Sequence, residues 1–265
     1  MSGEPMIDPA GGFARSAKGL WLPERVAHRP TCVDLFCGAG GFTLGMIQGG
    51  FEVLAGVDND PYSMLTYLLN LGSYPCEIHY VTPEDGERAN KVAQKHADGT
   101  RAGQGWISHN PDVPGVGHFW LGDVRKVTGA EILDALGLEV GELDCVCGGP
   151  PCQGFSISGK QDVMDPRNSL VFEFARLVLE MRPKTMVMEN VPGILSMVTP
   201  EGLPVVDELC RVLQDGGFGT VEALKRSLLA TAGAGAALRG DPVEKSRKRR
   251  LGEPVQAGLF EEVGS

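Results

Sequence analysis

Two residues that could react with a substrate follow neighbouring apolar runs of the sequence. Cys152 comes directly after Gly148–Pro151, and paired prolines after paired glycines form a stiff loop that would hold its thiol outside a core. Glu189 closes the apolar run 186–188, where partial burial would favour a protonated carboxyl group. Taken alone, Cys152 could be an inert thiol and Glu189 could pair with Lys184. Together, a thiol that attacks and a carboxyl group that donates a proton or hydrogen bond predict nucleophilic catalysis.

A glycine-rich turn follows the first apolar run, 31–36, and an acidic residue follows the second, 52–57. Gly38 and Gly40 lie where glycine lets a ligand approach the backbone, and the helix that follows offers free N–H groups. Thr43 stands where an NAD fingerprint has its third glycine, so that fingerprint is absent. Asp58 lies 24 residues beyond Asp34, near the spacing at which an acidic side chain meets a ribose diol. The pattern predicts a ligand that contains adenosine.

Short apolar runs alternate with helix-sized segments along most of the chain. Asp60 can cap a helix with Pro61 at its first position, and Thr128 with Glu131 forms a capping box. We expect further helices at 169–181 and 203–213, and strands at 31–36, 52–57, 118–121, 143–147 and 185–188. This alternation predicts a doubly wound, Rossmann-like α/β sheet. Ligands of such sheets bind at the carboxyl ends of the strands, and Asp123 adds one more carboxylate to that row.

Length and composition fit one globular domain. The chain has 265 residues, 42% of them apolar and 22% charged, with a formal net charge of −10. We expect a loosely ordered leader at 1–29, a catalytic domain at 30–222 and an Ala/Gly-rich, basic tail at 223–265. An insertion at 73–117, with a helix from about 82 to 96, is expected at one edge of the sheet.

The cysteines and the lack of long apolar runs predict a cytoplasmic protein. No apolar run is long enough to span a bilayer, and the N-terminus lacks a signal-peptide core. Seven cysteines in a chain of this length favour reduced thiols. Cys32, Cys145 and Cys147 lie inside predicted strands, as small buried hydrophobes do. We expect no metal site, because Cys145 and Cys147 alternate along one strand and no histidine near Cys152 completes a zinc ligand set.

With these residues identified, the chain resembles the DNA cytosine-5 methyltransferases. Asp34–Gly41 is similar to the family's S-adenosylmethionine loop, and Gly149–Gln153 to its nucleophile loop. Glu189–Val191 resembles the catalytic glutamate motif, and Asp165–Leu170 the segment that follows the nucleophile loop. The matches follow the family's order over about residues 31–222 and are specific as a set.

The resemblance implies a mechanism and an S-adenosyl-L-methionine site. The Cys152 thiolate would add to C6 of a flipped cytosine in DNA, while Glu189 contacts N3 and Asn190 positions the glutamate loop. Phe36 would pack on the cofactor's adenine, Asp58 would bind its ribose and Asp123 its amino group. The complete implied cofactor set is Phe36, Gly38, Gly40, Asp58, Asn59, Asp123, Val124, Pro151 and Leu170.

The C-terminal part departs from the family pattern. Family members carry a Gln-x-Arg-x-Arg motif, a target-recognition region and closing motifs, whereas residues 230–237 are almost all Ala and Gly, and the basic run 245–250 does not fit. Residues 223–265 carry a net charge of +3 and the rest −13, so the catalytic part has no evident way to hold DNA. We therefore expect no separate recognition domain here, and a second chain that carries one.

Other interpretations stay open at this point. The chain could be a compact enzyme that binds DNA through its own tail, or a cytosine-5 methyltransferase that acts on RNA. It could also be a non-catalytic remnant or regulator that binds S-adenosylmethionine without turnover. Covalent trapping on modified DNA and tRNA would separate these functions.

Overall fold

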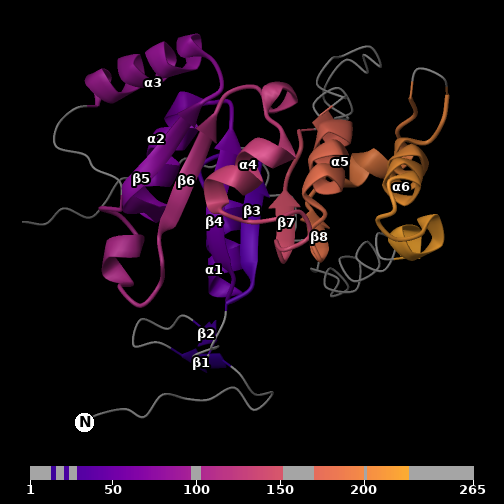
Figure 1. Cartoon of the computed structure of the whole chain (residues 1–265), viewed down its shortest axis with the longest axis horizontal. Coiled ribbons are helices and arrows are strands. Elements are labelled where there is room, and N and C mark those ends of the chain that lie inside the picture. The colour runs from indigo at the N-terminus through magenta and orange to yellow at the C-terminus, as the bar shows by residue number, and fades with distance from the viewer. Residues whose placement is uncertain are drawn as a thin grey trace, which may run out of the picture. The chain divides into compact units, whose positions relative to one another are not determined.

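A six-stranded parallel sheet forms the centre of the computed structural model. The structure describes residues 29–96, 103–151, 170–199 and 202–226, together with the backbone of 13–15 and 21–23. The strand order is β5-β6-β4-β3-β7-β8 (Figure 1). The bounds are β3 (Thr31–Leu35), β4 (Glu52–Asp58), β5 (Gly72–Tyr80), β6 (Val116–Leu121), β7 (Cys145–Gly148) and β8 (Thr185–Met188).

Helices cover both faces of this sheet, as the alternation of elements predicted. One face packs on α1 (Gly41–Gln48) and α2 (Pro61–Leu71), with α3 (Pro83–Lys95) against α2. The other face packs on α4 (Gly129–Leu136) and α5 (Leu170–Met181), with α6 (Val205–Asp215) against α5. The doubly wound α/β fold class is therefore confirmed.

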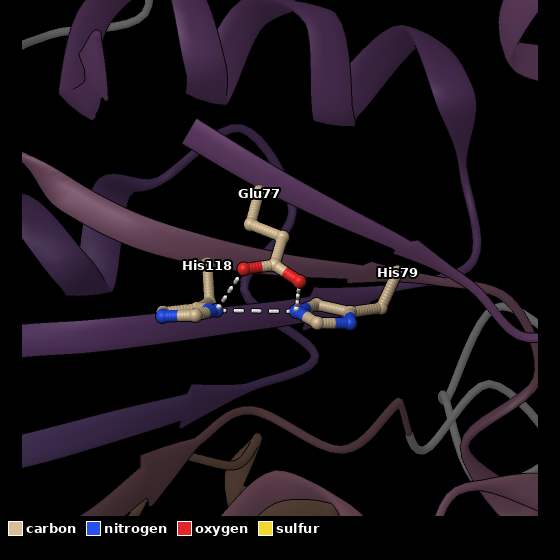
Figure 2. A group of neighbouring side chains, drawn as sticks. All are labelled: Glu77, His79 and His118. Atoms are coloured by element: carbon tan, nitrogen blue, oxygen red, sulfur yellow. Dashed lines mark hydrogen bonds and ion pairs between the residues drawn. The ribbon is translucent and has the colours of Figure 1, made fainter. Parts of the chain in front are cut away.

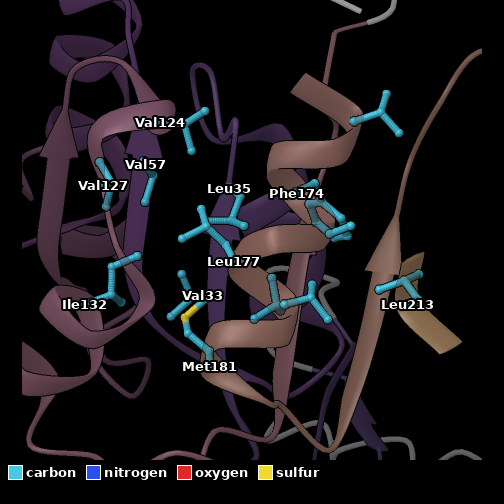
Figure 3. Close-up of a cluster of buried hydrophobic side chains, with 14 of the residues drawn as sticks. Val33, Leu35, Val57, Val124, Val127, Ile132, Phe174, Leu177, Met181 and Leu213 are labelled. Carbon is cyan, nitrogen blue, oxygen red and sulfur yellow. The ribbon is translucent and has the colours of Figure 1, made fainter. Parts of the chain in front are cut away.

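Alternation along the strands divides the core into two apolar layers. Val33 and Leu35 point to the face of α4 and α5, while Cys32, which precedes Val33, points to the face of α1 and α2. Figure 3 shows the first layer, in which Leu177 and Met181 of α5 lie against the strands. These side chains are almost fully buried, and their burial fixes the register of the sheet.

Local capping signals in the sequence set several helix starts. The Asp60 side chain accepts a hydrogen bond from the Ser63 amide at 2.9 Å and begins α2, with Pro61 at its first position. Thr128 and Glu131 form the predicted capping box of α4. Helix α6 begins two residues later than predicted, because Pro204 occupies its N-cap.

The strand order reverses at β3, which pairs with β4 on one side and β7 on the other. Such a reversal leaves a crevice outside the carboxyl ends of the two neighbouring strands, because the connections leave in opposite directions. The glycine-rich turn after β3 and the Gly149–Pro151 loop after β7 lie on either side of this point.

The segment 73–117 contains a strand that the sequence did not predict. Most of β5 lies in it and pairs in parallel with β6 at the edge of the sheet, and the predicted helix follows as α3. Gly72 and Pro75 weaken the strand pattern, and β5 follows α2 with no turn between them. Pairing with β6 outweighs these local preferences.

Two further findings concern the ends of the described chain. Strands β1 (Phe13–Arg15) and β2 (Trp21–Pro23) pair antiparallel in the segment where no regular element was expected. The basic run 245–250 and most of the predicted tail lie outside the described residues. No helix in the described ranges is both long and apolar enough to cross a membrane.

Candidate active site

The turn after β3 adopts a conformation that requires glycine. Gly38 and Gly40 have φ angles of +53° and +95°, in the region that side chains with a Cβ rarely adopt. A Cβ on Gly40 would lie 2.5 Å from Leu71 Cδ1. Phe36 also has a positive φ, 59°, and strained non-glycine residues of this kind cluster at functional sites.

Asp58 at the end of β4 holds this turn in place. Its Oδ2 accepts a hydrogen bond from the Gly38 amide at 2.8 Å, and its Oδ1 accepts one from the Asp60 amide at 2.9 Å. A carboxylate oxygen can accept a second hydrogen bond, so Asp58 can still bind a ligand hydroxyl. The carboxylate thus links the turn after β3 to the end of β4.

Asp123, after β6, is paired with a basic residue that the sequence analysis did not identify. Arg125 Nη2 lies 2.7 Å from Asp123 Oδ2, and Arg125 Nε lies 2.9 Å from Oδ1. The hydrogen bonds from Arg125 lower the pKa of the Asp123 carboxyl group, which is therefore ionised at neutral pH. The Asp-x-Arg spacing after a strand was the only signal for Arg125.

These strand ends surround one cavity of about 540 Å³. Seven of the nine residues predicted to bind the cofactor line it: Phe36, Asp58, Asn59, Asp123, Val124, Pro151 and Leu170. Gly38 and Gly40 are not in the lining but belong to the same turn. The sequence analysis missed Val57, Gly122, Arg125 and Gly149 as lining residues, and Asp60 also lines the cavity besides capping its helix. The volume is typical of a small-molecule site.

Glu189 lies next to the loop that leads to Cys152. The Glu189 amide donates to Gly148 O at 2.9 Å, and a Cβ on Gly149 would lie 3.2 Å from Glu189 Oε2. Asn190 Nδ2 donates to Pro150 O at 3.2 Å. Cys152 itself, and residues 165–169 of the predicted segment after it, lie outside the described residues.

Two expectations about Glu189 are changed by the structure. Lys184 pairs with Asp144, Nζ to Oδ1 at 2.6 Å, at the amino end of β8, so it does not pair with Glu189 at the carboxyl end. The expectation that Glu189 is partly buried was wrong, since its side chain is exposed. The reason is that Glu189 directly follows β8, one of the two edge strands of the described sheet.

The buried cysteines near the sheet do not compete for the role of nucleophile. Cys32, Cys37, Cys145 and Cys147 are buried, and the Sγ atoms of Cys32 and Cys147 are 3.5 Å apart. Burial raises the pKa of the Cys37 thiol well above its ordinary value. Buried thiols with raised pKa values are poor nucleophiles.

A buried hydrogen-bonded carboxyl group, that of Asp34, lies in β3 just before the glycine-rich turn. Asp34 in β3 is fully buried, and its Oδ2 accepts a hydrogen bond from Thr43 Oγ1 of α1 at 2.5 Å. Thr43 Oγ1 is also 3.0 Å from Tyr67 Oη of α2. Burial raises the pKa of Asp34 to about 6. Thr43 stands where an NAD fingerprint would have its third glycine, and its hydroxyl group joins β3 to α1 and α2.

Comparison with known proteins identifies relatives. A family model described as "C-5 cytosine-specific DNA methylase" matches residues 30–97 and 117–222. Type II methyltransferase M.XorII of Xanthomonas oryzae is 31% identical over 193 residues, which are 73% of this chain and 35% of the relative. Type II methyltransferase M.AquIA of Picosynechococcus is 33% identical over 175 residues, which are 66% of this chain and 53% of the relative.

A third relative, Type II methyltransferase M.DdeI of Desulfomicrobium norvegicum, is 31% identical over 186 residues, which are 70% of this chain and 34% of the relative. The chain thus spans between about a third and about a half of the length of these relatives. The family model covers the turn after β3, the loop after β7 and Glu189. The chain belongs to the C-5 cytosine-specific DNA methylase family.

Proposed function

We propose that this protein transfers the methyl group of S-adenosyl-L-methionine to C5 of a flipped cytosine in DNA. Cys152 is the nucleophile and Glu189 contacts the base. The observation that carries the proposal is the placement of the cavity beside the Gly149–Pro151 loop, to which Asn190 joins the glutamate. Residues 30–222 form the catalytic domain in this proposal.

The residues of the cavity fit the proposed cofactor. Among the described lining residues, three are acidic, Asp58, Asp60 and Asp123, and one is basic, Arg125. This excess of negative charge favours a ligand with a positively charged sulfonium group. When bound, S-adenosylmethionine supplies an electrophilic methyl group on that sulfur.

Each cofactor residue has a role that its chemistry allows. Phe36 offers an aromatic face to the adenine, Asp58 accepts hydrogen bonds from the ribose and Asp123 accepts one from the adenine amino group. Gly38 and Gly40 let the methionine part approach the backbone. Asn59, Val124, Pro151 and Leu170 complete the lining.

The protein's own side chains act on the cytosine. The Cys152 thiolate forms a bond to C6, while Glu189 hydrogen-bonds or protonates N3, and C5 becomes nucleophilic. After methylation, loss of the C5 proton restores the double bond between C5 and C6 and expels the thiolate. C6 is accessible to Cys152 only when the base is swung out of the duplex.

Trapping on DNA that contains 5-fluorocytosine tests this proposal. Fluorine in place of the C5 proton blocks the elimination step, so an active enzyme stays covalently attached in the presence of S-adenosylmethionine. We expect adducts with the unmodified chain and with Cys147→Ser, and none with Cys152→Ser. Cofactor binding by calorimetry without trapping on any substrate, in the presence as well as the absence of a partner chain, would instead identify a non-catalytic binding protein.

The choice between DNA and RNA as substrate requires a separate arm of that experiment. The family description and the relatives' names support DNA, and trapping on tRNA alone would overturn the proposal that DNA is the substrate.

We propose that a second chain carries the target-recognition domain. Apolar side chains on β8 and near the 3-10 helix η5 (Pro192–Ser196) support this proposal. Val187, Val191 and Leu195 are each more than 40% exposed, and neighbouring exposed apolar side chains are typical of a surface that another protein covers. Sequence-specific trapping by the chain alone would contradict it.

A further inference from the structure

Three potential metal ligands lie on one face of the edge strand β5 and its neighbour β6, away from the cavity at the strand ends. In the register of β5 and β6, Glu77 stands opposite His118 and His79 stands opposite Trp120. Because side chains alternate along a strand, Glu77 and His79 point to the same side as His118. The sheet itself therefore holds the three side chains together.

Their ligand atoms are at the spacing of a shared cation. His79 Nε2 and His118 Nδ1 are 3.1 Å apart, and each lies 3.8 Å from a carboxylate oxygen of Glu77. Figure 2 shows this carboxylate facing the gap between the two imidazole rings. Tetrahedral Zn²⁺ with bonds of about 2.0–2.1 Å places its ligand atoms about 3.3 Å apart, between the observed distances.

The surroundings hold one ligand rigidly and leave access to solvent. The His79 ring stacks on Trp120 at a centroid distance of 4.0 Å and an angle of 12°, and Trp120 is buried. The side chains of His79 and His118 are only 24% and 23% exposed, whereas that of Glu77 is 67% exposed. His79 also lines a second cavity of about 430 Å³, from which water can reach the site.

We propose that Glu77, His79 and His118 bind a divalent transition-metal ion, with Zn²⁺ as the best match. Two imidazole nitrogens and one carboxylate oxygen suit Zn²⁺, whereas Ca²⁺ and Mg²⁺ prefer oxygen ligands alone. Three protein ligands leave a fourth position for water. The ion joins the inserted edge strand β5 to β6, so the site does not depend on the proposed methyl transfer.

Metal titration of the full chain tests the site. The metal-free, reduced protein is titrated with Zn²⁺ in a calorimeter and with Co²⁺ in a spectrophotometer. We expect one high-affinity ion per chain, and a Co²⁺ spectrum without a thiolate-to-metal charge-transfer band. His118→Gln should weaken Zn²⁺ binding by about a hundredfold, because it removes an imidazole ligand. Glu77→Gln should weaken it by about tenfold, because it removes a carboxylate ligand that is more exposed to solvent.

Cys76→Ser is the matched control. Cys76 is adjacent to Glu77 but points to the opposite side of β5, so this variant should bind Zn²⁺ as the unmodified chain does. Zn²⁺ should also raise the unfolding midpoint of the unmodified chain more than that of Glu77→Gln, which folds because Glu77 is exposed. Absence of saturable binding, or equal binding by Glu77→Gln and the unmodified chain, would overturn the site and leave a hydrogen-bonded histidine pair.

Discussion

Asn190 donates a hydrogen bond from Nδ2 to the carbonyl oxygen of Pro150 across 3.2 Å. Its own Oδ1 accepts one from the Val191 amide at 2.8 Å. The amide group thus connects the loop after β8, which carries Glu189, to the loop after β7, which leads to Cys152. Through this side chain, the loop that carries Glu189 is joined to Pro150, two residues before the proposed nucleophile in the sequence.

Replacement of Asn190 by alanine should slow methyl transfer without weakening cofactor binding. Loss of the link to Pro150 lets the glutamate loop shift, and a misplacement of about 1 Å can reduce a rate by about a hundredfold. Single-turnover transfer and calorimetry with S-adenosylmethionine measure the two effects separately. Val140→Ala, at an exposed side chain between α4 and β7 and away from both loops, is the control and should keep the full rate.

Asp58→Asn should weaken binding of S-adenosylmethionine by about tenfold or more. The amide keeps one acceptor oxygen but replaces the other by a donor, which opposes the amide of Gly38 or Asp60. Calorimetric titration gives the affinity. Asp112→Asn, outside the cavity lining, should bind as the unmodified chain does, and equal affinities for all three would show that Asp58 does not contact the ligand.

Two glycine substitutions, one in the turn and one in helix α1, should have opposite effects on stability. Gly40→Ala combines a φ of +95° with a Cβ only 2.5 Å from Leu71 Cδ1, and should cost about 2 kcal/mol in the free energy of unfolding. Gly45→Ala lies in α1 with nothing within 4 Å of its Cβ, and should gain about 0.5–1 kcal/mol. Urea unfolding measures both, and equal effects would contradict the described turn.

Asp34 should make stability fall as the pH rises towards neutrality. Burial raises the pKa of its carboxyl group from 3.8 to about 6, so the folded state favours the protonated form. Its contribution is complete below about pH 3.8, is lost as the pH rises through about 6, and amounts to about 3 kcal/mol.

Comparison with Asp34→Asn isolates this effect, because the other titrating groups are common to both chains. The free energy of unfolding of the unmodified chain, minus that of the variant, should decrease by up to about 3 kcal/mol between about pH 4 and pH 7. Urea unfolding at several pH values gives this difference. A constant difference over that range would mean that Asp34 ionises at its ordinary pKa.

Local signals in the sequence were sufficient for much of the fold and of the cavity. Asp60 and Thr128 cap helices within three residues of themselves, and Gly38 lies in a turn with its own backbone requirement. Asp58 was identifiable because its distance from Asp34 reflects one strand–helix–strand unit. These features depend on neighbours in the sequence, so a single chain reveals them.

Features that depend on strand order could not be predicted in the same way. The exposure of Glu189 follows from the position of β8 at the sheet edge, and the contact between Glu77 and His118 follows from the register of β5 with β6. Pairing with β6 also made a strand of a segment with poor strand propensity. Arg125 contributes to the cavity through its ion pair with Asp123, which depends on the turn after β6.

The addition of β5 changes the mobility expected of the cavity wall. With β5 in place, β6 is hydrogen-bonded on both sides, and the turn that carries Asp123 extends from an inner strand. Amide protons of β6 that bond to β5 can exchange with solvent only when β5 detaches, whereas edge strands exchange more readily. The hydrogen bonds between β5 and β6, the strand that leads to Asp123, therefore break no more often than β5 detaches. An ion bound to both strands would slow that detachment.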